Sequence, residues 1–322
     1  MHNKTFSEQS SCTVLYAPGI GLIIALPIIK LNLLFFDVTS KYAVDNNNHR
    51  LFFMSKISMK LKVSCDIRFQ IGSPTALILM LRPLSGAQQK IAKSSYTVEP
   101  DVPIIEGKDT YGNYCQRLVA PPGECVIQTS SEVITAESID SAPGAYFIEI
   151  QNLPNCVLPF LLPSRYCESD RFGNLAREII ADALPGYDQV GKIVDWVRYT
   201  IKYIPGSSES PLSAIEVHHR GYGVCRDLAQ LSIALCRSIS IPARLVVGYL
   251  YRLEPMDLHA WFEAYIGGRW YAFDPTQNEL RGGRVIIAFG RDAADVSIFH
   301  QFGLDCLLNS MEVRVDLMDE AL

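Results

Sequence analysis

Between Met59 and about Ile150 the chain alternates polar and apolar residues in short runs that are typical of half-buried β-strands. The clearest run covers 60–69, and an apolar run of strand length follows at 76–81. Later strand-like runs lie at 125–129 and 145–150, separated from the first ones by turn signals at 109–113 and 120–123. Short strands punctuated by turns predict a small antiparallel β-sandwich domain over residues 59–152.

The pattern changes after a stretch at 153–164 that contains three prolines and is predicted to be a linker. Beyond it, apolar residues recur at helical spacing over 170–184 and again over 188–203. Strand-like runs return after these helices. The fold class expected from the whole pattern is therefore α+β, with a second domain over residues 165–322.

Residues 1–58 form an apolar extension whose most hydrophobic part is Val14–Phe36. A membrane-spanning helix needs about 20 apolar residues, and this run is interrupted by Pro18, Pro27 and Lys30. The residues on either side of the run do not match a signal peptide, which has a basic leader before it and a small-residue cleavage site after it. Membrane contact is expected only if the apolar run belongs to the natural protein.

Three interpretations of this extension compete. It is a membrane anchor, an apolar segment packed on the body, or a stretch outside the natural protein because the start was assigned too early. We favour the third interpretation, because Met54 and Met59 both precede the first clean strand. The expected location is then cytoplasmic, and it becomes membrane-anchored if the extension is native.

The composition excludes several classes of protein. The 322 residues include 29 Lys and Arg against 34 Asp and Glu, a net charge of −5, and 48% are hydrophobic. That is ordinary globular usage, unlike a disordered chain, and it gives no overall basic footprint for nucleic acid. Nine cysteines occur without a CxxC pair, so most are expected to be buried thiols.

Cys225 is the cysteine with a distinctive setting. It follows a glycine-containing segment, 221–223, and precedes an amphipathic helix with leucines at 228, 231 and 235. Unpaired backbone N–H groups in the first turn of a helix favour an anion, and a thiolate is an anion. Gly223 would let a substrate approach closely. A cysteine that begins a helix is also often only a packed thiol, so the segment alone does not decide its role.

A predicted hairpin supplies partners for such a thiol. Strands over 259–266 and 269–275 flank a two-glycine turn. The register of a two-residue turn makes Asp274 the diagonal neighbour of His259 on the same face, within reach of an imidazole and a carboxylate. A thiol, a base and a group that orients the base are the parts of an activated nucleophile.

These residues lie in a series of short motifs along one half of the chain. The motifs are Gly-Val-Cys-Arg-Asp at 223–227, Ile-Pro-Ala-Arg at 241–244, Gly-Tyr at 248–249, His-Ala-Trp at 259–261 and Phe-Asp-Pro-Thr at 273–276. In this order they resemble the transglutaminase-like superfamily in its bacterial branch, over roughly residues 160–300. The resemblance implies a papain-like α+β core with Cys225, His259 and Asp274 as the catalytic triad.

The resemblance also implies acyl transfer on protein or peptide amides through a thioester, ended by an amine (transamidation) or by water (hydrolysis). A cysteine peptidase with the same triad, and a non-catalytic protein-binding module of the same fold, are the alternatives. Trp261 is expected either to wall the acyl channel or to pack in the core. Arg226 and Asp227 are expected to cap or solvate the helix rather than react. The adjacent His218 and His219 diverge, so no metal is expected, and the chemistry requires no cofactor.

Overall fold

The computed structural model of the protein describes residues 58–318, apart from positions 87, 280, 297 and 304. The predictions made for the apolar extension, including the run at 14–36, therefore lie outside the described residues. Helices and strands both contribute, and the fold is α+β. No helix within 58–318 has the length and apolar character needed to cross a bilayer.

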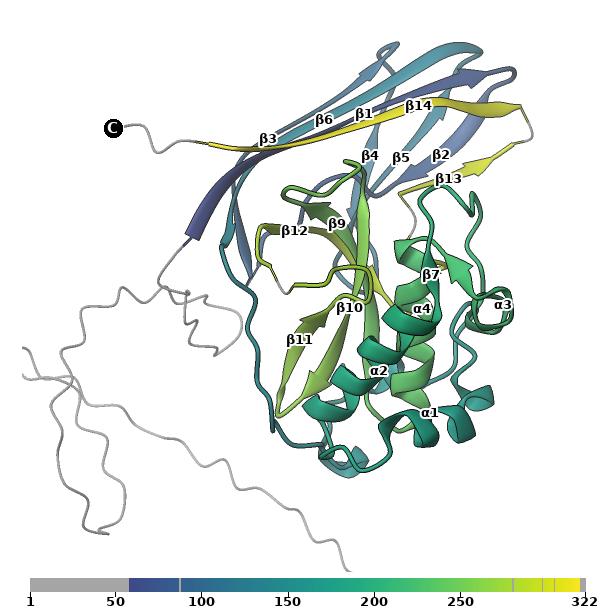
Figure 1. Cartoon of the computed structure of the whole chain (residues 1–322). Coiled ribbons are helices and arrows are strands. Elements are labelled where there is room, and N and C mark those ends of the chain that lie inside the picture. Colours follow the sequence, from purple (N-terminus) through teal and green to yellow (C-terminus); the bar gives the residue numbers. More distant parts are fainter. Residues whose placement is uncertain (1–57, 87, 280, 297, 304, 319–322) are drawn as a thin grey trace, which may run out of the picture.

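The first unit is built from two four-stranded antiparallel sheets, in the orders β14-β1-β6-β3 and β13-β2-β5-β4. Figure 1 shows its long strands curving across the top of the molecule. The strands are β1 (Ser58–Ile71), β2 (Thr75–Leu79), β3 (Gln89–Glu99), β4 (Ile105–Lys108), β5 (Tyr114–Ala120), β6 (Gly123–Ala136), β13 (Phe299–Phe302) and β14 (Cys306–Leu317).

The alternation that predicted β1 is confirmed, because every second side chain from Leu61 to Phe69 is fully buried. Phe69 meets Phe299 of the other sheet edge to face, with ring centroids 5.2 Å apart. The sequence placed everything from 165 to 322 in the second domain. The structure differs, since residues 299–317 return to the first unit and pair with β1 and β2.

The segment predicted as a strand at 145–150 and the predicted linker after it form no sheet. A single bridge joins Tyr146 to Gly186, and 3-10 turns follow at Ile150–Asn152 and Leu158–Leu161. The apolar side chains here pack on the helical unit instead. Phe160 meets the ring of Trp270 at 5.4 Å, so the proline-rich stretch is part of the packed body.

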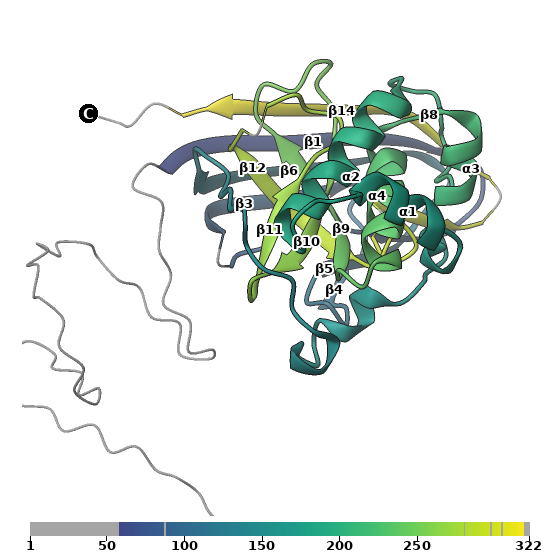
Figure 2. The ribbon, with the colours of Figure 1, turned by 60° about the horizontal axis from the view of Figure 1, so that its bottom comes forward.

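The second unit packs helices on one face of the sheet β11-β10-β9-β12 (Figure 2). Its central helix α4 contacts β10 and β9, and every residue of β10 is buried. The elements are α1 (Gly173–Ile180), α2 (Tyr187–Thr200), β7 (Lys202–Tyr203), α3 (Ala214–Arg220), β8 (Tyr222–Gly223), α4 (Cys225–Ser238), β9 (Ala243–Leu250), β10 (His259–Ile266), β11 (Arg269–Phe273) and β12 (Arg284–Gly290).

Side-chain amides of the first unit occupy the free edge of β12. Gln89 accepts from the N–H of Ile286 (2.6 Å) and donates to its carbonyl (2.8 Å). Asn113 makes the same pair of bonds to Phe289, at 3.0 and 2.8 Å. An exposed strand edge leaves backbone groups unpaired, and these two amides satisfy them as a neighbouring strand would. The two units are therefore joined along the strand that begins with Arg284.

Candidate active site

Cys225 is the first residue of α4, and its side chain is half-buried. The backbone N–H of Cys225, at the start of the helix, has no acceptor within the helix, whereas the N–H of Asp227 already donates to the Val224 carbonyl at 3.0 Å. Asp227 holds this turn, because its carboxylate accepts from the N–H of Val224 (3.2 Å) and from Arg226 Nε (3.1 Å), and bonds the Ser208 hydroxyl. The prediction that Arg226 and Asp227 serve the helix end thus agrees with the contacts.

His259 begins β10, and Asp274 directly follows β11. The predicted register is confirmed, with Ile266 opposite Arg269. The ladder ends at Phe273, one residue before Asp274, yet the carboxylate still reaches the imidazole: Asp274 Oδ2 lies 2.8 Å from His259 Nε2. Both side chains are only 1% exposed, so water does not compete for this bond.

Because Asp274 engages Nε2 of His259, Nδ1 is the ring nitrogen left for proton exchange with a reactant. Cys225 is close enough to His259 to influence its protonation. Burial alone would lower the pKa of His259, but the negative charge of Asp274, aided by Cys225, raises it to about 9. An imidazolium is therefore favoured beside the sulfur at neutral pH, and the structure brings the three predicted triad residues together.

Both carboxylate oxygens of Asp274 accept hydrogen bonds. Thr276 donates to Oδ1 through its backbone N–H (3.0 Å) and its hydroxyl (2.7 Å). Arg284 Nη2 donates to Oδ2 at 3.1 Å, the oxygen that also contacts His259. Burial by itself would raise the pKa of this carboxyl, yet His259 and Arg284 lower it well below its usual range. Asp274 is thus a fixed, ionised carboxylate.

Tyr203 is close enough to Cys225 and Asp274 to feel their charges. It pairs in parallel with Gly223, so its side chain lies on the side of the ladder where a Cβ built on Gly223 would lie. A Cβ on Gly223 would lie 2.9 Å from Asp227 Cβ in the first turn of α4, which identifies that side as the one facing the helix end. Burial, and then the charges of Cys225, Asp257 and Asp274, raise the pKa of Tyr203 to about 12. The phenol therefore remains a hydrogen-bond donor.

Gly223 and Trp261, the two residues predicted to border the substrate channel, are both buried. Gly223 is buried, and the close approach of Asp227 leaves no room for a side chain there. Trp261 is 1% exposed and lies beside His259, with ring centroids 6.3 Å apart and an angle of 26° between the planes. Its alternative role, packing in the core behind the imidazole, is the one that its burial supports.

His218 and His219 lie away from the triad, on α3. With Arg171, Phe172, Leu175 and Ile215 they line a surface cavity of about 250 Å³. Among residues 58–318, outside the four undescribed positions, no three His, Cys, Asp or Glu side chains gather as metal ligands would. The eight cysteines in this part of the chain are free thiols.

Comparison with known proteins places this geometry in a family. The profile of the transglutaminase-like superfamily matches residues 173–275, a segment that contains Cys225, His259 and Asp274. A solved structure from Cytophaga hutchinsonii, described as a candidate cysteine protease, is 36% identical with a TM-score of 0.76, and the match covers 83% of this chain and 93% of that one. The chain belongs to the transglutaminase-like superfamily.

Two further proteins are less similar to this transglutaminase-like chain. An uncharacterized protein of Mycobacterium leprae is 28% identical over 232 residues, which is 67% of this chain and 82% of that protein. The periplasmic domain of TgpA from Pseudomonas aeruginosa is 17% identical with a TM-score of 0.34, covering 68% of this chain and 87% of that one.

Two residues at this site, Arg284 and Tyr203, could not be recognised from the sequence. Arg284 lies outside the segment matched by the family profile, and an arginine at the start of a strand carries no pattern of its own. Tyr203 was placed at the end of a predicted helix, whereas it forms the short strand β7. Thr276 was part of the Phe-Asp-Pro-Thr motif, and an Asp followed two residues later by Thr is a signal for the turn that it makes.

Proposed function

We propose that this protein is a cysteine-dependent acyltransferase or hydrolase that acts on protein or peptide amides through a thioester at Cys225. The observation that carries the proposal is the buried His259–Asp274 hydrogen bond of 2.8 Å beside a half-buried thiol that influences the pKa of His259. A fold that served only as a binding module would have no need of this arrangement. The site supports an activated nucleophile best.

In the first half-reaction the Cys225 thiolate attacks the amide carbonyl carbon, and the carbonyl oxygen becomes an oxyanion. The backbone N–H of Cys225 and the phenol of Tyr203 are the proposed donors to that oxygen, because the first belongs to the nucleophile itself and the second is close enough to Cys225 to feel its charge. The His259 imidazolium then protonates the leaving nitrogen. The C–N bond breaks, an amine or ammonia departs, and the acyl group remains on sulfur.

The second half-reaction needs His259 in its neutral form. It takes a proton from water or from an amine as that nucleophile attacks the thioester carbonyl. The C–S bond breaks, the thiolate returns, and the imidazolium is restored beside it. Water gives hydrolysis and an amine gives transamidation, so access of the acceptor to the thioester decides between the two reactions.

Peptide cleavage is the second candidate, and one finding favours it: the Cytophaga relative at 36% identity is described as a candidate cysteine protease. Incubation of the protein with a peptide library, with and without a primary amine, distinguishes the reactions. Ammonia release or an amine adduct indicates a side-chain amide as substrate, and a shortened peptide indicates a backbone amide. If no product depends on Cys225, the proposal is wrong.

A further inference from the structure

Arg284 is a buried cation at the triad that the proposed chemistry does not use directly. It is 8% exposed, and its Nη2 donates to Asp274 Oδ2, the oxygen that also contacts His259. Its guanidinium carbon lies 4.9 Å from the ring centre of Trp261, which in turn stacks beside His259. Arg284 and His259 therefore contact the same carboxylate oxygen and the same indole.

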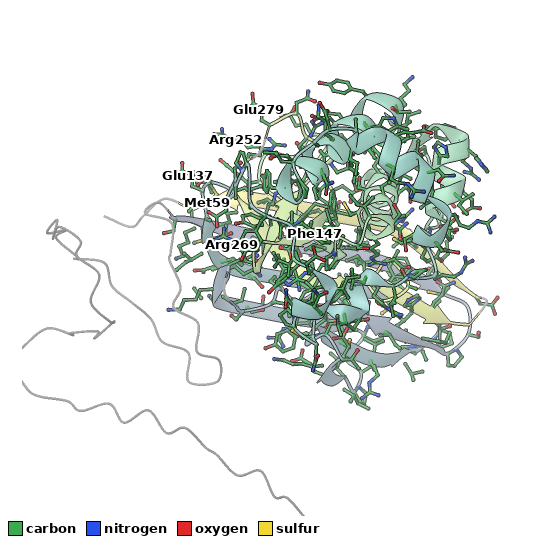
Figure 3. The ribbon with its side chains drawn as sticks, turned by 90° about the horizontal axis from the view of Figure 1, so that it is seen from below. Met59, Glu137, Phe147, Arg252, Arg269 and Glu279 are labelled. Atoms are coloured by element: carbon green, nitrogen blue, oxygen red, sulfur yellow. The ribbon has the colours of Figure 1, made fainter. Side chains whose placement is uncertain are left out.

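The first unit fixes the backbone of Arg284. The Thr135 hydroxyl donates to the Arg284 carbonyl at 2.7 Å, and the N–H of Gly283 donates to the Ala136 carbonyl at 2.9 Å. A Cβ on Gly282 would fall 2.2 Å from the backbone carbon of Glu137, so only glycine allows this approach. Figure 3 shows Glu137 and Met59 close to the loops that carry Arg252 and Glu279, at this junction.

The contact between Arg284 and Asp274 affects how the charges of the site are balanced during the reaction. In the first half-reaction of the proposed function, the attacking Cys225 thiolate offsets the His259 imidazolium, and the Arg284 guanidinium offsets the Asp274 carboxylate. In the acyl-enzyme the thioester carries no charge and His259 must be neutral to act as a base. Asp274 would then be an uncompensated buried anion without Arg284, and a buried unpaired charge is strongly unfavourable.

We propose that Arg284 is a positioning residue whose guanidinium keeps the Asp274 carboxylate compensated and oriented, so that His259 can alternate between its charged and neutral forms. The inference rests on the proposed function for its meaning in the reaction cycle. It requires no substrate, however, for its first test, because the charge state of His259 can be measured in the free protein.

The other charged groups around these side chains make no equivalent contact. His259 is faced by Cys225 from α4, by Asp274 after β11 and by Asp257 from the loop before β10, with the neutral phenol of Tyr203 nearby. Around Arg284, the further charges are Arg281 and Glu263. Among the described residues, Arg284 is thus the one cation besides the His259 imidazolium that bonds the Asp274 carboxylate, since Arg198 of α2 donates only to the Asp274 backbone carbonyl, at 3.0 Å.

The test is an NMR titration of His259 in protein with labelled imidazole carbons, with its signal assigned by its loss in His259→Gln. Removing the charge in Arg284→Met or Arg284→Gln should move the titration midpoint upward by about one pH unit. Arg284→Lys, which keeps the charge, should stay close to the wild-type midpoint. Arg252→Met, an exposed arginine on a neighbouring loop, is the matched control and should cause no shift.

A folded neutral variant that titrates at the wild-type pH would overturn the inference, since a structural role alone leaves the midpoint unmoved. If neither neutral variant folds, Arg284→Lys decides: a displaced midpoint despite the retained charge would equally overturn it. In the acyl-enzyme formed with p-nitrophenyl acetate, the neutral variants should hydrolyse about tenfold more slowly near neutral pH, because less His259 is uncharged. If no acyl-enzyme forms even in wild type, the proposed function fails while the titration still reports on Arg284.

Discussion

Two buried carboxylates, each paired with an arginine, lie on or beside the hairpin β10-β11, and only one of them belongs to the candidate site. Glu263 in β10 is 0% exposed and accepts from Arg244 Nε at 2.7 Å and from Gln88 at 3.2 Å. Asp274 is 1% exposed and accepts from Arg284, Thr276 and His259. Burial and an arginine partner are therefore common to both.

The difference lies in the remaining partners. The Arg244 guanidinium lies over the rings of Trp270 (4.2 Å) and Phe289 (3.9 Å), so the partners of the Glu263 pair are aromatic rings and the Gln88 amide, which do not titrate. The Asp274 pair instead has an imidazole that can gain or lose a proton, and behind it a half-buried thiol. A buried ion pair is weak evidence for function, and a titrating third partner beside a nucleophile is what distinguishes the two clusters.

Removing the nucleophile has the largest expected effect. Cys225→Ala should reduce acyl transfer from p-nitrophenyl acetate to the uncatalysed background, because no thioester can form. It should also abolish the rapid alkylation of the folded protein by a low dose of iodoacetamide at neutral pH. Intact-mass measurement of the acyl and alkyl adducts checks both, with Cys156→Ala at an exposed cysteine as the control. An adduct that persists in Cys225→Ala would refute the assignment.

Asp274→Asn should come next. An amide at this position no longer supplies a charge to His259 and leaves Arg284 without its counter-ion, so kcat/KM should fall by about 10³-fold, somewhat less than the loss seen for the equivalent change in a serine protease. Steady-state kinetics with the activated ester measure it. A loss below tenfold in a folded variant would show that the carboxylate does not orient His259.

Tyr203→Phe should have an intermediate and selective effect. Loss of one donor to the oxyanion should slow acylation by about 10- to 100-fold. Alkylation by iodoacetamide displaces iodide from a tetrahedral carbon and forms no oxyanion, so its rate should be unchanged. Comparing the two rates isolates the donor role from thiol activation. Tyr199→Phe, at a largely exposed tyrosine of α2, is the matched control, and equal slowing of both reactions would contradict the proposal.

The cluster around Asp274 also shows how much of the site could be predicted from the sequence. The two-glycine turn fixed the hairpin register, and the helix beginning at Cys225 followed from its leucine spacing, so the three triad residues could be placed without coordinates. Local pattern and turn chemistry were sufficient there because each element is determined by its own residues. The short helix α3 was missed, although Ser213 and Glu216 make the capping box that marks such a start.

Residues positioned by distant parts of the chain could not be predicted in this way. Arg284 reaches Asp274 only because β12 is fixed against the first unit through Thr135, Gln89 and Asn113. The return of residues 299–317 to that unit was missed for the same reason, since strand pairing over more than two hundred residues leaves no local signal. Long-range contacts thus account for most of what the sequence did not supply.

Glu263→Gln should have the smallest effect on activity and thereby sharpen the contrast between the clusters. It leaves Arg244 buried without a counter-ion, so the free energy of unfolding should fall by about 3 kcal/mol, while the kinetics of the folded molecule stay within about twofold because the triad is untouched. Urea denaturation and ester kinetics on the same preparation measure the two quantities.

The pH dependence of that loss separates the clusters further. The raised pKa of His259 means that its pair with Asp274 stabilises the fold fully below about 6.5, the unfolded value, and that this stabilisation disappears as the pH rises through about 9. The deficit of Asp274→Asn relative to wild type should therefore shrink between pH 6.5 and 10. The Glu263 pair includes no imidazole, so the deficit of Glu263→Gln should not follow this course. If the loss in free energy of unfolding changes with pH in the same way for both variants, then both carboxylates have only a structural role and His259 titrates independently of Asp274.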